Sequence, residues 1–184
     1  FLSACSSGSV EDGFTYDKKV GIDDTATLGE LDKSQWELNL NKDSFDADTE
    51  LTMNVLSEEE AQAMAGDFQL LSAPVSLNVK DRDGIRLSSP ATIKVKIPDD
   101  YTGPYSSLFM GYYTDEGWEY FTPDYIDLKE GVVYTTLYHF SGYGFGVPSE
   151  QEQIATYAKK VAANNWVQSN NHADLIEATK NQYD

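Results

Sequence analysis

Alternation of apolar and polar residues over short runs is the feature that most constrains the fold of this chain. Three runs carry their apolar side chains two positions apart: Trp36, Leu38 and Leu40; Leu51, Met53 and Val55; and Ile93, Val95 and Ile97. Because successive side chains of a β-strand point to opposite faces, this period predicts strands with one buried and one solvated face. Turn-forming residues separate such runs by roughly 8–12 residues, which favours a set of short antiparallel strands.

Residues 35–148 are therefore expected to form a mainly β domain, an antiparallel β-sandwich. Asp83-Gly84 and Asp115-Glu116-Gly117 lie between predicted strands and are expected to be hairpin turns. The side chains expected to lie mostly inside are apolar residues of the predicted strands: Trp36, Leu51, Met53, Val55, Leu77, Ile93, Val95, Ile97, Phe109, Trp118, Val133 and Leu137.

One segment inside the β region carries helical signals. Ser57 suits an N-cap, Glu60 stands three residues later where a capping box needs it, and Gly66 fits a C-terminal stop. A short helical insert is therefore expected over residues 57–66.

Residues 149–184 follow a different period. Ile154, Tyr157, Ala158 and Val161 have the spacing of an amphipathic helix, and Asn164-Asn165 is expected to interrupt it. A second helix is expected around three further residues, Leu175, Ile176 and Thr179. We expect this C-terminal pair of helices to form a tail that either docks on the sheets or begins a further domain.

The N-terminus carries a motif that bears on location. Leu2-Ser3-Ala4-Cys5 reads as a bacterial lipobox, and Cys5 is the only cysteine in the chain. Residues 1–4 are expected to be the remnant of a lipoprotein signal peptide, and Cys5 is expected to be acylated. The sequence thus predicts an extracytoplasmic protein, anchored by lipid to the bacterial cell membrane or the outer membrane.

Residues 5–34 are expected to form a flexible acidic tether. They are rich in Ser, Gly, Asp and Thr, and Asp23-Asp24 and Glu30-Leu31-Asp32 add like charges. Such a composition is typical of chain that cannot bury enough apolar surface to fold.

The charge of the chain limits its partners. A formal net charge of −18 is unsuited to nucleic acid, because a binder needs cations that replace phosphate counterions. A single cysteine leaves no intramolecular disulfide, so folding depends on burial of the core. We expect no nucleic-acid partner and no cofactor, and a surface partner that is an unidentified protein or glycan.

Three stretches in the β region resemble the ZU5 family of β-sandwich domains. They are residues 43–52, which look like an opening loop and strand, residues 85–95, which look like a proline-containing strand, and residues 137–143, which look like the terminal strand. The resemblance implies the sandwich fold. In some ZU5-like domains the tripeptide equivalent to His139-Phe140-Ser141 cleaves itself between its second and third residues.

Self-cleavage would need a definite arrangement of this tripeptide. The Ser141 hydroxyl would attack the Phe140 carbonyl while His139 takes the hydroxyl proton. The alternative is that the tripeptide belongs to a plain closing strand, in which His139 and Ser141 share one face. We expect the plain strand and an intact chain.

Other candidate sites are weaker. Asp81-Arg82-Asp83-Gly84 and the group Asp43, Asp46 and Asp48 could place oxygen ligands around Ca²⁺, although a solvated turn explains each of them. The two histidines, His139 and His172, lie far apart in the sequence, so we expect no metal site. Exposed aromatic rings can stack on a glycan or on a protein; the candidates for such a patch are Tyr112, Tyr113, Trp118 and Tyr120.

Three functions remain open from the sequence. The first is a non-catalytic, lipid-anchored cell-surface module that binds or spaces something. The second is a self-cleaving domain cut between Phe140 and Ser141, and the third is an accessory domain of a larger surface enzyme. The sequence shows no acid pair, nucleophile elbow, metal set or phosphate loop, so we expect no enzymatic activity of its own.

Overall fold

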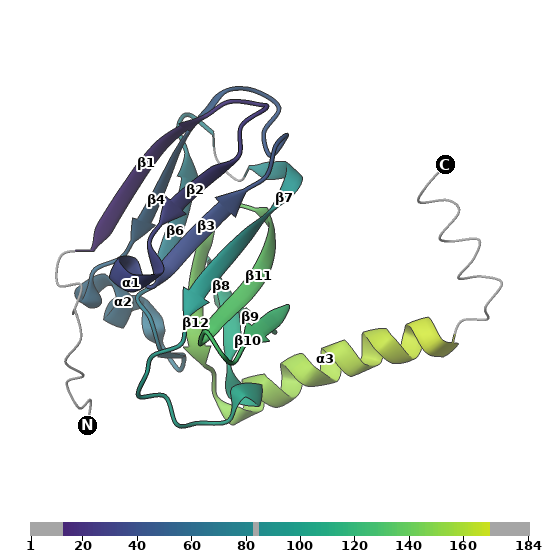
Figure 1. The fold of residues 1–184 in the computed structure, drawn as a ribbon. Coiled ribbons are helices and arrows are strands. Elements are labelled where there is room, and N and C mark those ends of the chain that lie inside the picture. Colours follow the sequence, from purple (N-terminus) through teal and green to yellow (C-terminus); the bar gives the residue numbers. More distant parts are fainter. Residues whose placement is uncertain (1–12, 83–84, 170–184) are drawn as a thin grey trace. The chain divides into compact units, whose positions relative to one another are not determined.

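The structure is a computed structural model that describes residues 13–82 and 85–169 (Figure 1). The chain divides into two units, Phe1–Ser149 and Glu150–Asp184. The division falls where the hydrophobic period of the sequence changes from strand to helix.

The first unit is built from two antiparallel sheets. The seven-stranded sheet runs in the order β1 (Phe14–Val20), β4 (Thr49–Val55), β6 (Val75–Val79), β12 (Gly142–Val147), β8 (Phe109–Thr114) and β9 (Gly117–Phe121), and β5 (Gln69–Leu70) also pairs with β12. The five-stranded sheet runs in the order β10 (Tyr125–Asp127), β11 (Val132–His139), β7 (Arg86–Lys96), β3 (Trp36–Leu40) and β2 (Ala26–Gly29). The mainly β, antiparallel class predicted from the sequence is confirmed.

The core follows the period of two. Buried side chains from both sheets belong to one hydrophobic cluster. Trp36 on β3 is fully buried, and its indole N–H donates a 2.7 Å hydrogen bond to the carbonyl of Ala73. Of the twelve residues expected inside, all are buried except Trp118, which is half-buried.

The helical insert is confirmed as α2 (Glu58–Ala65). Its capping box is complete: the Glu60 N–H donates to the Ser57 hydroxyl, and the Ser57 N–H donates to the Glu60 carboxylate. A 3₁₀ turn, η1 (Tyr105–Ser107), precedes β8.

The second unit contains α3 (Glu150–Ser169). The interruption expected at Asn164-Asn165 is wrong, since the helix continues through both residues. Asparagine costs a helix only about 0.7 kcal/mol per residue relative to alanine, so two of them do not stop it. The second helix, expected around Leu175 and Ile176, lies outside the described residues. No helix in the described ranges has the length and apolar character needed to cross a membrane.

The tether expected over residues 5–34 is wrong for its described part. β1 pairs with β4 along seven residues, from Phe14 opposite Val55 to Val20 opposite Thr49, and β2 pairs with β3. Residues 17–19 of β1 are all charged, so the alternation of apolar and polar residues that would predict a strand is not visible there. Both strands are sheet edges, where exposed charges are common because they discourage pairing with other chains.

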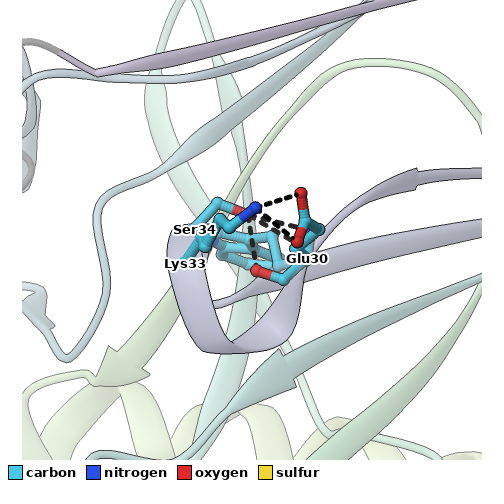
Figure 2. Close-up of polar contacts among 4 residues, drawn as sticks. Glu30, Lys33 and Ser34 are labelled. Atoms are coloured by element: carbon cyan, nitrogen blue, oxygen red, sulfur yellow. Dashed lines mark hydrogen bonds and ion pairs between the residues drawn. The ribbon is translucent and has the colours of Figure 1, made fainter.

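A short helical turn, α1 (Leu31–Ser34), joins these two edge elements to the core. The backbone N–H groups of Lys33 and Ser34 both donate to the Glu30 carbonyl, and the Lys33 ammonium pairs with the Glu30 carboxylate (Figure 2). The Ser34 hydroxyl lies 3.1 Å from the Glu30 carbonyl and 3.0 Å from that of Trp36, and it can donate to one at a time. The acidic run around Glu30 is thus an ordered turn that leads into β3.

The hairpin expected around Asp83-Gly84 is also wrong, because the strands on either side, β6 and β7, belong to different sheets. Asp83 and Gly84 themselves lie outside the described residues. The hairpin expected at Asp115-Glu116-Gly117 is confirmed, because β8 and β9 pair directly from Thr114 opposite Gly117.

Candidate functional site

The His139-Phe140-Ser141 segment lies where the chain passes from one sheet to the other. β11 ends at His139 in the five-stranded sheet, and β12 begins at Gly142 in the seven-stranded sheet. The expectation of a single closing strand is therefore wrong. The pairing of β11 with β7 also shifts register between Leu137 and His139, so regular alternation ends before Phe140 is reached.

The backbone on both sides of the Phe140–Ser141 peptide is held by hydrogen bonds. The Phe140 N–H donates to the Ile85 carbonyl at 3.1 Å, and the Ser141 carbonyl accepts from the Leu77 N–H at 3.1 Å. The Phe140 side chain is buried and packs edge-on against Phe45, with ring centroids 5.9 Å apart. Phe140 thus serves as a core residue at the crossing.

The His139 side chain is engaged with tyrosines. The Tyr143 hydroxyl donates a 2.7 Å hydrogen bond to the His139 carbonyl and lies 3.3 Å from the His139 Nδ1. The Tyr112 ring meets the imidazole edge-on at 5.8 Å between centroids. Burial, together with the neighbouring Tyr112, raises the pKa of Tyr143, so its hydroxyl remains protonated and able to donate.

This geometry sets what the tripeptide can do chemically. A general base must come within hydrogen-bond reach of the proton it removes. The polar contacts of His139 join its ring and its carbonyl to Tyr143 on β12, the next strand along the chain, rather than its ring to the Ser141 hydroxyl. The arrangement fastens the end of β11 to the start of β12.

The four aromatic residues proposed as one patch lie on opposite faces of the seven-stranded sheet. Tyr112 packs against the hydrophobic core, and its hydroxyl donates to the Glu119 carboxylate. Tyr113, Trp118 and Tyr120 occupy alternating positions, outside the core cluster. We call Phe68, Tyr113, Trp118 and Tyr120 the outer aromatic cluster. Three edge-on ring contacts connect its members, with ring centroids 5.0–5.3 Å apart.

Trp118 has a packing role in the outer aromatic cluster. Its indole N–H donates a 2.8 Å hydrogen bond to the Met64 carbonyl near the end of α2. Its ring covers two glycines, since a Cβ on Gly111 would lie 3.0 Å from the ring and one on Gly144 only 2.7 Å from it. Among the glycines at every second position of β12, Gly144 is the one that leaves room for this ring, since a Cβ on Gly142 would meet the Tyr113 Cβ and one on Gly146 the Gln69 carbonyl.

The two acidic loops considered for Ca²⁺ meet through an ion pair. The Arg82 guanidinium lies 2.9 Å from the Asp46 carboxylate. The hydrogen bond and the charge of Arg82 hold the pKa of Asp46 below its usual range. Within residues 13–82 and 85–169, no group of three or more His, Cys, Asp and Glu side chains converges as metal ligands would.

Four of the candidate residues, Cys5, Asp83, Gly84 and His172, lie outside the described residues. In comparisons with known proteins, no protein-family model matches the chain, and no curated protein matches it.

Proposed function

We propose that this chain is a non-catalytic, lipid-anchored module of the bacterial cell surface, with a ZU5-like β-sandwich that binds or spaces a partner. The observation that carries the proposal is the lone Cys5 in Leu2-Ser3-Ala4-Cys5, placed shortly before the first strand. Such a cysteine supports acylation, and acyl chains anchor a protein without a spanning helix.

The position of β1 gives the proposal a geometric consequence. Eight residues, 6–13, separate Cys5 from Phe14 at the start of β1. Even fully extended, they reach no farther than about 30 Å. A module anchored at Cys5 would therefore keep the start of β1 within about 30 Å of the membrane.

The sandwich part of the proposal is supported by the shared core. Two antiparallel sheets contribute alternate side chains to one hydrophobic cluster, as two facing sheets do. The stretches that resemble ZU5 domains coincide with the loop before β4 together with its first residues, with β7, and with the crossing from β11 to β12.

Membrane fractionation tests the anchor. The precursor, expressed in a bacterium with its native leader, is expected in the membrane fraction and in the detergent phase after phase partition. Cys5→Ala should move the protein to the aqueous phase, whereas the neighbouring control Ser6→Ala should behave as the parent. A Cys5→Ala protein that stays membrane-bound to the same extent as the parent would refute the proposal.

Self-cleavage remains the second candidate, and one observation favours it. Phe140 and Ser141 lie outside both strands, so the peptide between them is not part of a regular ladder. We propose nevertheless that the chain stays intact, because the His139 imidazole contacts Tyr143 and Tyr112. The purified protein should give one band on a denaturing gel. Two bands divided at Phe140–Ser141, and abolished by Ser141→Ala, would make self-cleavage the leading function. The accessory-domain function stays a prediction.

A further inference from the structure

The five-stranded sheet presents tyrosines on the face turned away from the core. Along β11, Val133, Thr135 and Leu137 are buried, while Tyr134 and Tyr138 occupy the alternate positions. Tyr138 is 64% exposed. Tyr125 on β10 lies opposite Tyr134 in the register, is 60% exposed, and has its ring centroid 5.7 Å from that of Tyr134. We call Tyr125, Tyr134 and Tyr138 the tyrosine platform.

A row of paired side chains continues the platform across the sheet. In the register, Tyr134 lies opposite Lys94, and Lys94 lies opposite Glu37. The Lys94 ammonium is 5.6 Å from the centroid of the Tyr134 ring and 2.8 Å from the Glu37 carboxylate. Asn39 donates a further 2.9 Å hydrogen bond to Glu37. Lys94 is thus neutralised by Glu37 and lies over one face of the Tyr134 ring, so a ligand would stack on the other face.

A second row on the same face carries hydroxyl and amide groups. Thr136 lies opposite Thr92, Thr92 opposite Asn39, and Asn39 opposite Thr27. Thr136 stands between Tyr134 and Tyr138 along β11, so hydrogen-bonding groups alternate with rings. From the rise of a strand, Tyr134 and Tyr138 are about 13 Å apart along the chain direction.

We propose that the tyrosine platform binds an uncharged glycan chain, by stacking of sugar rings on Tyr134 and Tyr138 and hydrogen bonding of sugar hydroxyls to the threonine and asparagine row. This proposal gives the binding role proposed above a site and a ligand class, and it rests on that role.

Charge selects the class of ligand. The chain carries a net charge of −18, which opposes an anionic ligand. Both lysines of this face already have carboxylate partners, Lys94 with Glu37 and Lys96 with Asp32 at 3.7 Å. An anion would therefore have to compete with a carboxylate for either lysine, and a cation would have to compete with a lysine for either carboxylate.

The spacing of the rings favours a glycan over a protein. The centre of a protein interface is a contiguous apolar area. Here a hydroxyl-bearing residue, Thr136, separates the rings of Tyr134 and Tyr138. A sugar chain repeats apolar ring faces and hydroxyl groups along its length. This repeat matches the alternation of tyrosine rings with the Thr136 hydroxyl along β11. The separation of about 13 Å calls for an oligosaccharide rather than a single sugar.

Native affinity electrophoresis tests the platform with the full chain carrying Cys5→Ala, so that the lipid anchor plays no part. The gels contain hydroxyethylcellulose, arabinoxylan, mannan, starch or β-1,3-glucan as uncharged polysaccharides, and polygalacturonate as an anionic one. At least one uncharged polysaccharide is expected to retard the protein. Tyr134→Ala and Tyr138→Ala should each weaken the interaction about tenfold. Tyr134→Phe and Tyr138→Phe should retain most of it, because they keep the ring.

Tyr113→Ala is the matched control, since Tyr113 is an exposed tyrosine, 41% accessible, on the seven-stranded sheet. Thermal unfolding of every variant checks that the fold is retained. The proposal would be overturned if none of the uncharged polysaccharides retards the protein, or if polygalacturonate alone does. It would also be overturned if the parent and the two alanine variants are retarded equally. Capture of a protein through the platform in place of any polysaccharide would overturn it as well. Each of these results would leave the membrane anchor standing, because fractionation tests Cys5 independently.

Discussion

The indole ring of Trp118 on β9 lies against the backbone of Gly144 on β12, two strands away in the same sheet. A Cβ at position 144 would come within 2.7 Å of the Trp118 Cη2 and 2.9 Å of its Cζ3. Such distances are closer than real side chains approach, and the indole is fixed by its hydrogen bond to the Met64 carbonyl. This contact joins β9, β12 and α2 on the outer side of the seven-stranded sheet.

Gly144→Ala is therefore expected to destabilise the protein by about 1–3 kcal/mol, the usual cost of forcing an extra carbon into a packed site. Gly142→Ala is the matched control, on the same strand and face, where a Cβ would meet its nearest neighbour, the Tyr113 Cβ, at an ordinary 3.7 Å. Urea unfolding monitored by tryptophan fluorescence measures both. Equal losses for the two variants would show that Trp118 does not occupy this place.

Tyr143→Phe tests the hydrogen bond from the Tyr143 hydroxyl to the His139 carbonyl, which joins the start of β12 to the end of β11. Removing the hydroxyl leaves the His139 carbonyl without its 2.7 Å donor, so the free energy of unfolding should fall by about 1 kcal/mol. Tyr138→Phe, which changes an exposed hydroxyl five residues before it, should have almost no effect. If the two variants are equally stable in urea, the hydrogen bond from Tyr143 contributes nothing.

Limited proteolysis distinguishes an ordered N-terminal strand from a long tether. Because β1 pairs with β4 over its whole length, trimming from the N-terminus should stop ahead of Phe14. Mass spectrometry of the resistant fragment gives its first residue. A resistant fragment that begins near Gln35 and still unfolds cooperatively would show that β1 and β2 are dispensable.

The ion pair between Glu37 and Lys94 predicts a pH dependence. Burial raises the pKa of Glu37, but hydrogen bonds from Lys94 and Asn39 outweigh this effect and leave the pKa below its usual value. A lowered folded pKa stabilises the protein above the unfolded pKa of about 4.3, and the contribution disappears as pH falls through the folded pKa. Glu37→Gln should thus cost about 0.5–1 kcal/mol near neutral pH and less near pH 3.

Urea unfolding of the parent and Glu37→Gln at the two pH values makes the comparison. Glu130→Gln is the control, because the ion pair of Glu130 with Lys129 is long, at 3.9 Å, and exposed. A loss of stability on Glu37→Gln that is the same at both pH values would contradict the assigned ion pair.

The sequence predicted the structure well where a strand buries one face and leaves the other near solvent. Trp36 and Leu38, and likewise Ile93 and Val95, are apolar residues two positions apart, which predicts strands that bury these side chains, and the structure has both strands. The capping box of Ser57 and Glu60 located the helical insert, because these side chains specify a helix start locally.

The remainder depended on tertiary context. β1 has charges at its centre and gains its hydrogen bonds from β4, about 30 to 40 residues away, so local composition suggested a tether. The crossing at Phe140 and Ser141 was missed because alternation continues through the sequence while the chain changes sheets. The tyrosine platform was missed because crowding in the sequence drew attention to Tyr112 and Tyr113, which face opposite ways.

The most direct test of the account is the mass of the N-terminal peptide of the protein isolated from the bacterial membrane. The account predicts a peptide that begins at Cys5 and carries the added mass of acyl chains, with residues 1–4 removed. An N-terminal peptide in which Ala4 is still joined to an unmodified Cys5 would contradict it.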